Sequence, residues 1–343
     1  MNNTEPLVSV VMPVYNSAKY LREAIESILD QTYTNFEFFI FNDGSADESH
    51  QIITSYQDPR IRYHSYATNS GYVTHLNKGI ELAQGKYIAR MDSDDVSLPT
   101  RFAEQVAFLE ANPTYGVCGS SFTFIGDATH SRILPVEDEE IKVKLIASCV
   151  ISHPSVMIRR QLLIDNQLAY EESVAPAEDY YLWCALSPLT KFYNLPTPLL
   201  KYRAHEGQIS QYKKMKQITG ANAARRNYFK INGFDVVPAE ADALRKLVEL
   251  EEDDILQAGD LRAINNAASA LISQNQRLHF FDGKQLRAFT SEKWTHLTSQ
   301  IRLFSPAFIQ PLLLSDKGFI VRIPLQTKAV LLAKSLLSWK TRI

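Results

Sequence analysis

Cysteine is scarce in this chain: three occur in 343 residues, and their wide separation matches no zinc or iron–sulfur spacing. Cys118, Cys149 and Cys184 therefore indicate free thiols in a reducing cytoplasm. Excess charge is also missing, because the formal net charge of -2 offers no polycation for a nucleic-acid partner. No apolar run approaches the roughly 18 residues that a membrane-spanning helix needs. The short polar start at 1–6 is expected to be neither a signal peptide nor an anchor.

Short apolar runs alternate with amphipathic segments through the first hundred residues. Strands are predicted at 7–13, 36–41 and 61–66 and in the run into Asp92, with helices at 18–31, 46–56 and 72–83. Such alternation predicts an α/β fold with a mostly parallel sheet flanked by helices. Ligands of such sheets bind beyond the carboxyl ends of the strands, where the loops at Pro13, Asp43 and Asp92 fall.

The most informative of these loops carries three carboxylates within four positions, at Asp92, Asp94 and Asp95. Carboxylates this close repel one another, and a divalent metal with oxygen ligands compensates the repulsion. Mn²⁺ or Mg²⁺ held in this way is usually completed by phosphate oxygens, which indicates a nucleoside diphosphate ligand. The alternative is that Asp94 or Asp95 caps a helix that begins near Leu98.

A set of ordered motifs carries a family resemblance. The motifs are Val10-Val11-Met12-Pro13-Val14-Tyr15-Asn16, Asn42-Asp43-Gly44-Ser45, Asn69-Ser70-Gly71, Asp92-Ser93-Asp94-Asp95, His153-Pro154-Ser155, Glu178-Asp179 and Tyr202-Arg203-Ala204-His205. In order and spacing they resemble glycosyltransferase family 2 of the GT-A fold. The resemblance implies inverting transfer of a sugar from a nucleoside diphosphate sugar. It extends to about residue 210, so we expect a GT-A catalytic domain at 1–210 and a helical appendage at 211–343.

The resemblance also implies site residues. Those expected to bind the nucleotide sugar are Pro13, Val14, Tyr15, Asn16, Asp43, Asn69, Asp92, Ser93 and Arg203, and those expected to hold the metal are Asp94, Asp92 and His205. A carboxylate at Asp43 suits the N–H of uracil or guanine, although Asp-Gly is also a common turn former. Tyr15 could equally be a core aromatic, and His205 a structural histidine. Arg203 has a planar fork that pairs well with phosphate.

The catalytic base is expected to be Asp179, which takes the acceptor's proton opposite the leaving diphosphate. Glu178 is its acceptor-binding partner or the alternative base. Acids in the first turn of a helix also oppose the helix dipole, which is the structural alternative for both. Because a metal neutralises the leaving group, no general acid is needed.

The C-terminal third has helical periodicity, with helices expected at 216–230, 239–257, 261–277 and 283–303. No acid follows Asp316, and residues 317–343 carry six Lys or Arg side chains among apolar ones. Such a basic amphipathic tail can lie on an anionic membrane face, or dock on its own domain.

A cytoplasmic enzyme that extends a polyprenyl-diphosphate-linked glycan acceptor, in O-antigen or capsule synthesis, is the expected function. The Gln-x-x-Arg-Trp motif of processive synthases is missing, which favours a single transfer. One alternative is a nucleotidyltransferase, but the first strand is not followed by the Gly-rich basic loop that a triphosphate needs. The other is a non-enzymatic nucleotide- or sugar-binding module, against which the two acidic motifs argue.

Overall fold

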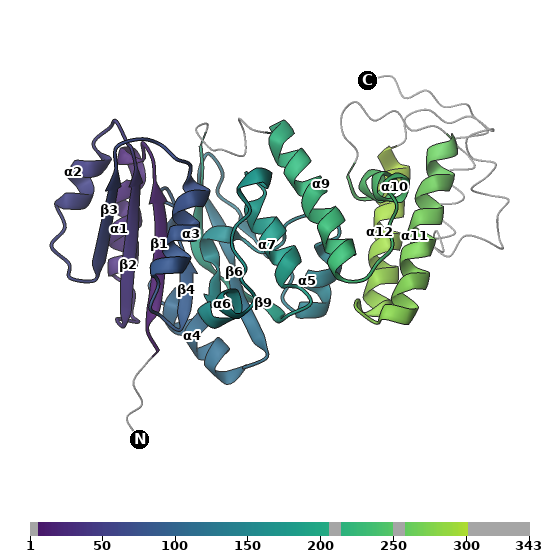
Figure 1. The fold of residues 1–343 in the computed structure, drawn as a ribbon, viewed down its shortest axis with the longest axis horizontal. Helices are drawn as coiled ribbons and strands as arrows, with labels where there is room; N and C mark the ends of the chain where they lie inside the picture. The colour runs from purple at the N-terminus through teal and green to yellow at the C-terminus, as the bar shows by residue number, and fades with distance from the viewer. Residues whose placement is uncertain (1–5, 206–213, 250–257, 301–343) are drawn as a thin grey trace. The chain divides into compact units, whose positions relative to one another are not determined.

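The computed structural model describes residues 6–205, 214–249 and 258–300, and the chain divides into two compact units (Figure 1). The first unit comprises Met1–Ile141 and Cys149–Ala224, and the second comprises Lys142–Ser148 and Arg225–Ile343. The expected domain boundary after residue 210 and the basic tail at 317–343 lie outside the described residues. Both therefore stay predictions.

A nine-stranded sheet organises the first unit, in the order β3-β2-β1-β4-β8-β6-β9-β5, with β7 paired to β6. The strands are β1 (Val8–Val14), β2 (Phe36–Asp43), β3 (Ile61–Tyr66), β4 (Tyr87–Arg90), β5 (Val96–Ser97), β6 (Tyr115–Gly126), β7 (Ser131–Arg132), β8 (Met157–Arg159) and β9 (Lys191–Ala204). From β3 to β4 all neighbours are parallel. Beyond β4 the sheet is mixed, since β8 runs antiparallel to both β4 and β6.

Helices flank this sheet, as Figure 1 shows. They are α1 (Ala18–Leu29), α2 (Ser49–Thr54), α3 (Tyr72–Leu82), α4 (Arg101–Ala111), α5 (Asp138–Lys144), α6 (Arg160–Asp165), α7 (Glu178–Leu186) and α9 (Lys214–Ile231), with 3-10 turns η1 (His153–Ser155) and η2 (Glu172–Val174). The predicted order of strands and helices up to β4 is confirmed. Helix α2 starts later than predicted because Asp47 accepts the backbone N–H groups of Ala18 and Ser49, which forms a turn instead.

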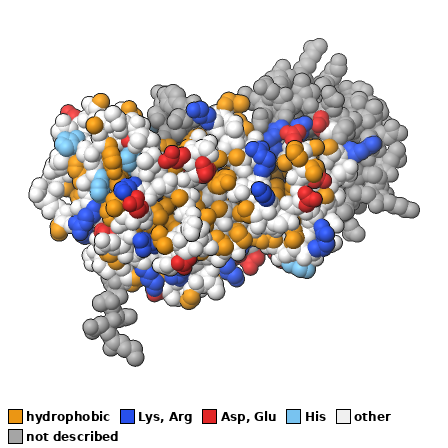
Figure 2. Space-filling model, viewed as in Figure 1, with side chains coloured by type: hydrophobic (Ala, Val, Ile, Leu, Met, Phe, Trp, Pro, Cys, Tyr) orange, Lys and Arg blue, Asp and Glu red, His pale blue; other side chains and the backbone are white. Residues whose placement is uncertain are grey.

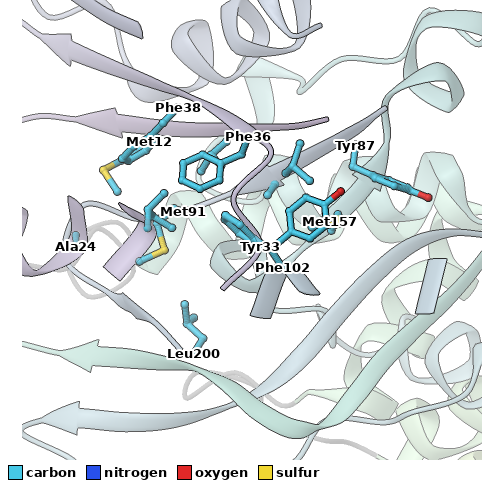
Figure 3. Close-up of a cluster of buried hydrophobic side chains, with 14 of the residues drawn as sticks. Met12, Ala24, Tyr33, Phe36, Phe38, Tyr87, Met91, Phe102, Met157 and Leu200 are labelled. Carbon is cyan, nitrogen blue, oxygen red and sulfur yellow. The ribbon is translucent and has the colours of Figure 1, made fainter. Parts of the chain in front are cut away.

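The core of the first unit fixes where the strands end. Every residue of β2 is buried, as expected of a parallel strand covered on both faces. Met12, Phe38, Phe102 and Met157 belong to one cluster of buried hydrophobic side chains (Figure 3). Since β1, β2 and β4 are parallel neighbours in this core, their carboxyl ends lie at one edge of the sheet.

The second unit is helical, as predicted. It contains the end of α9 with α10 (Pro238–Val248), α11 (Ala258–Leu278) and α12 (Gly283–Gln300). Its core includes the buried aromatic rings of Tyr228, Phe234, Phe281 and Trp294.

On the face drawn in Figure 2, acidic and basic side chains are interspersed rather than segregated. Among the helices that the structure describes, none combines the length and apolar character that crossing a bilayer requires.

Candidate active site

Three carboxylates gather directly after β4. One oxygen each of Asp92, Asp94 and Asp95 lies within 4.8 Å of the others. The side chains of Asp92 and Asp94 are 32% and 29% exposed, whereas Asp95 is buried. The alternative that Asp94 or Asp95 caps a helix is wrong, because β5 intervenes and Thr100 is the N-cap of α4.

Asp95 shows that this cluster is short of positive charge. Its Oδ1 accepts the backbone N–H of Arg203 at 2.8 Å, but its buried Oδ2 has no hydrogen-bond partner among the described residues. Burial, followed by the charges of Asp92 and Asp94, raises the pKa of Asp95 well above its usual value. A divalent cation bound by these oxygens would give Asp95 Oδ2 a partner and would offset the repulsion among the three carboxylates. The residues present therefore fit Mn²⁺ or Mg²⁺.

His205 and Arg203 both reach Asp94 from the end of β9. The Nε2 atom of His205 lies 2.9 Å from Asp94 Oδ2, and Arg203 Nε donates to the Asp94 carbonyl at 2.7 Å. Arg203 also pairs with Glu23 and lies over the ring of Tyr20, 4.4 Å from its centroid. Its guanidinium thus fixes the acidic loop, and its contact with phosphate stays a prediction.

Asp43 ends β2 with a carboxylate that is almost fully enclosed. Its Oδ1 accepts the Ser70 N–H at 2.7 Å, its Oδ2 accepts the Gly71 N–H at 2.9 Å, and His75 Nε2 lies 2.7 Å from Oδ1. Burial raises the pKa of Asp43, but these hydrogen bonds together lower it below its usual value. Asp43 is therefore an ionised acceptor that also shapes the exposed loop at Asn69.

The loop after β1 presents an aromatic side chain to solvent. Pro13 and Val14 belong to β1, while Tyr15 is 51% exposed. The alternative that Tyr15 is a core residue is wrong. Asn16 has a φ of 49° and donates its backbone N–H to Ser45 Oγ at 3.0 Å, so the loops after β1 and β2 are tied together. Tyr15 can therefore meet a ligand at this edge of the sheet.

A second pair of acids begins α7. The Glu178 carboxylate is buried, accepts the hydroxyl of Tyr72 at 2.7 Å, and lies 3.9 Å from His153 Nδ1. Burial, and then the charge of Asp179, raises the pKa of Glu178 to about 7. Both acids lie in the first helical turn, so the favourable interaction with the helix dipole also holds.

Asp179 differs from its neighbour in being partly exposed. The thiol of Cys149 donates to Asp179 Oδ2 across 3.5 Å, and the backbone N–H of Tyr180 donates to Oδ1. Burial raises the pKa of Asp179, while both hydrogen bonds oppose the rise. A raised pKa at a partly exposed carboxyl suits proton transfer at neutral pH.

Arg90, the last residue of β4, is buried. It forms an ion pair with Asp92. Its charge also opposes the rise in pKa of Asp95, Glu178 and Asp179. One buried cation therefore influences both acidic groups.

Comparison with known proteins decides the family. The model described as Glycosyl transferase family 2 matches residues 9–166. An uncharacterised glycosyltransferase of Haemophilus influenzae is 30% identical over 266 residues, which cover 73% of this chain and 82% of the relative. One from Methanocaldococcus jannaschii is 35% identical over 224 residues, covering 62% and 76%. The chain belongs to glycosyltransferase family 2.

Solved structures of GT-A glycosyltransferases share the fold of this family 2 chain. S. aureus TarS 1-349, in complex with UDP-GlcNAc, superposes with a TM-score of 0.58 at 19% identity, covering 87% of this chain and 93% of TarS. The mannosyltransferase PcManGT of Pyrobaculum calidifontis, in complex with GDP-Man and Mn²⁺, gives 0.54 at 16% identity, covering 91% and 88%. At these identities the likeness shows the fold alone.

In this family 2 chain, several residues predicted to act together are neighbours. Asp92 and Asp94 share the acidic cluster, His205 contacts Asp94, and Ser93 Oγ lies 2.7 Å from Ser17 Oγ. The loop after β1 therefore contacts the acidic loop through these two serines. Among the described residues, no hydrogen bond joins Asn69 to these side chains.

Sequence reasoning missed three residues that hold the acids: Arg90, Tyr72 and Cys149. Arg90 carried a signal, because it is the only charged side chain of the buried strand β4. Tyr72 and Cys149 carried none, since they meet Glu178 and Asp179 across 106 and 30 positions of sequence.

Proposed function

We propose that this protein is a metal-dependent, inverting glycosyltransferase that moves one sugar from a nucleoside diphosphate sugar to a hydroxyl of a glycan acceptor. The observation that carries the proposal is the acidic cluster after β4, which is short of positive charge and lies on the same sheet edge as Asp43. The fold and family fit this reaction.

Asp94, Asp92 and His205 would hold Mn²⁺ or Mg²⁺, which when bound neutralises the charge of the leaving diphosphate. The acceptor oxygen bonds to the anomeric carbon as the bond from that carbon to the diphosphate breaks, which inverts the configuration. Asp179, which is partly exposed at the start of α7, takes the hydroxyl proton. Glu178, held by Tyr72, binds and orients the acceptor.

A UDP-sugar is the proposed donor. The Asp43 carboxylate is ionised and accepts N–H groups, which suits N3–H of uracil or N1–H of guanine and does not suit N3 of cytosine. TarS binds UDP-GlcNAc and UDP, and PcManGT binds GDP-Man. These three ligands contain uracil or guanine, the two bases whose N–H group a carboxylate can accept. Tyr15, exposed at the end of β1, supplies an aromatic face for the base or ribose.

The proposed acceptor is a lipid-linked oligosaccharide for O-antigen or capsule, reached at the cytoplasmic face of the membrane. Six basic side chains and no acid in residues 317–343 would attract this segment to anionic lipid. The proposal for this segment rests on its sequence, since it lies outside the described residues.

Calorimetric titration with UDP, GDP, CDP and dTDP, with and without Mn²⁺, tests the donor site. We expect Mn²⁺-dependent preference for UDP, weakened at least about tenfold by Asp94→Ala. The matched control is Asp165→Ala, which removes an exposed carboxylate from the end of α6. Binding without Mn²⁺, or none, would contradict the site. Binding without turnover of any UDP-sugar would favour a binding module.

A further inference from the structure

Tyr20 is a partly buried aromatic residue in the first turn of α1, and three basic side chains lie against its ring. The guanidinium carbon of Arg203 is 4.4 Å from the ring centroid, and the Lys19 Nζ atom is 4.8 Å from it. The His205 ring is also a neighbour, with 5.2 Å between the two ring centroids and 46° between the two planes. The electron-rich face of a tyrosine attracts cations, and guanidinium groups stack on it.

Helix α1 holds the Tyr20 ring in a fixed place. Residues three apart on a helix lie on one side of it, so Tyr20 and Glu23 are neighbours on the surface of α1. The Glu23 carboxylate forms an ion pair with the guanidinium of Arg203, whose carbon lies over the Tyr20 ring. Four other side chains of α1 are fully buried in the core of the first unit: Leu21, Ala24, Ile25 and Ile28. An anchored helix therefore offers a ring and a carboxylate to the same arginine.

The two residues from the end of β9 that meet this ring also contact the acidic cluster after β4. Arg203 donates its Nε–H to the Asp94 carbonyl at 2.7 Å and its backbone N–H to Asp95 Oδ1 at 2.8 Å. The Nε2 atom of His205 lies 2.9 Å from Asp94 Oδ2. His205 comes one residue after β9, so strand pairing does not orient its ring. Direct contacts thus run from Tyr20 through Arg203 and His205 to the carboxylates.

We propose that Tyr20 is a positioning residue for the metal site: its ring orients His205 towards Asp94 and holds Arg203 against the acidic cluster. The inference rests on the proposed function, in which Asp94, Asp92 and His205 would hold Mn²⁺ or Mg²⁺. Tyr20 is not itself a ligand in this proposal. It acts through His205, because a metal ligand binds best when a neighbouring group fixes the orientation of its ring.

Two substitutions at Tyr20 separate the aromatic face from simple packing. Tyr20→Phe keeps the electron-rich face and removes only the hydroxyl, so Arg203 and His205 should keep their places. Tyr20→Leu keeps an apolar side chain on a good helix former but removes that face. A ring needed only for packing could change the stability of the fold, but it would leave the Mn²⁺ affinity of the folded protein unchanged.

The experiment measures the affinity of the full chain for Mn²⁺ alone by calorimetry. In Tyr20→Leu we expect Mn²⁺ to bind about fivefold more weakly than in the wild type, and in Tyr20→Phe within about twofold of it. The matched control is Tyr56→Leu, which removes a partly buried ring that contacts Arg22 and Glu26 of α1 instead. This control should also stay within about twofold of the wild type.

The same substitution in a protein without His205 tests whether the ring acts through that residue. In His205→Ala the ligand that the ring orients is already absent, so adding Tyr20→Leu should weaken Mn²⁺ binding by less than about twofold. A further loss as large as the one in the wild type would show that the ring acts by another route, and would overturn the inference.

A folded Tyr20→Leu protein that binds Mn²⁺ as tightly as the wild type would overturn the inference and leave the proposed function intact. A Tyr20→Phe protein as weak as Tyr20→Leu would overturn it too, because the hydroxyl rather than the ring would then be responsible. If Tyr20→Leu does not fold, Tyr20→Met, another good helix former without a ring, takes its place. A wild type that binds no Mn²⁺ would contradict the metal dependence of the proposed function, and the inference with it.

Discussion

The strand-end acids, Asp92, Asp94 and Asp95, and the helix-start acids, Glu178 and Asp179, are carboxyl groups in opposite surroundings. Asp92 and Asp94 are about one-third exposed, and a buried oxygen of Asp95 lacks a partner in the described chain. Glu178 is enclosed, and a neutral hydroxyl donates to it. The first group is short of positive charge and open to solvent, which suits a cation. In the second group Glu178 is shielded from solvent and has a raised pKa, which suits a proton that comes and goes near neutral pH.

A second cluster of acids in one site therefore need not be a second metal site. The helix-start acids already have hydrogen-bond donors in Tyr72 and Cys149, and burial raises the pKa of both acids. Protonation, rather than a metal, is the response that such surroundings favour.

Replacing Asp179 should lower the rate of sugar transfer strongly while leaving donor binding almost unchanged. Asp179→Asn keeps the size of the side chain but cannot accept the acceptor's proton, so kcat should fall by about 10²–10⁴-fold. Mn²⁺-dependent UDP binding should stay within about twofold, because the strand-end acids are untouched. Steady-state kinetics and calorimetry on the same samples measure the two quantities, with Asp165→Asn as the control. A larger fall in Glu178→Gln than in Asp179→Asn would assign the base to Glu178.

Removing the Glu178 charge should stabilise the fold. The carboxyl titrates near 4.5 when unfolded and near 7 when folded, so the folded state holds more protons between these values and stability falls as pH rises through them. At about pH 8 the buried charge then costs about 3 kcal/mol. Glu178→Gln should raise the free energy of unfolding by about 2–3 kcal/mol at that pH.

Urea unfolding at about pH 8 and at about pH 4 measures this effect, with Glu48→Gln as an exposed control. The gain should vanish at the lower pH, where the carboxyl is protonated in both states. A gain of equal size at both values would mean that packing, rather than charge, is responsible.

Much of the fold was predictable from sequence because its signals are local. The alternation that placed β1 to β4 comes from apolar runs bounded by Pro13, Asp43 and Asp92, and parallel pairing then puts these boundaries on one edge. The mixed part of the sheet was not predictable in this way. Strand β8 has three residues and pairs antiparallel with β4, a contact that only the packed core determines.

The site was predictable only where its residues follow one another in the sequence. The strand-end acids follow each other in sequence, so their chemistry was visible as a motif. What holds the helix-start acids was not visible, because Tyr72 and Cys149 lie far from them in sequence and meet Glu178 and Asp179 only in the folded chain. The helix-cap alternative for Asp95 failed for a similar reason, since the backbone of Arg203 occupies the carboxylate.

Removing the Tyr72 hydroxyl should have a smaller effect on the same carboxyl. Tyr72→Phe deletes the hydrogen bond to Glu178 Oε2, which favours the ionised form, so the pKa of Glu178 should rise by about one unit or less. The midpoint of Glu178 in a ¹³C NMR titration of labelled glutamate carboxyls, assigned with Glu178→Gln, measures the change. Tyr181→Phe, on the same helix as Glu178, is the matched control. A fall in the midpoint would mean that the hydroxyl acts by another route.

The smallest effect is expected at Cys149, where two variants should act in opposite directions. The thiol is a weak donor to Asp179, so Cys149→Ala removes a hydrogen bond that favours the carboxylate and should raise the pKa of Asp179 by a few tenths. Cys149→Ser supplies a stronger donor and should lower it by about as much. The pH dependence of kcat/KM in the two variants measures both shifts. Shifts of the same sign would point to altered packing. A hydrogen bond to the carboxylate predicts instead that alanine raises the pKa of Asp179 and that serine lowers it.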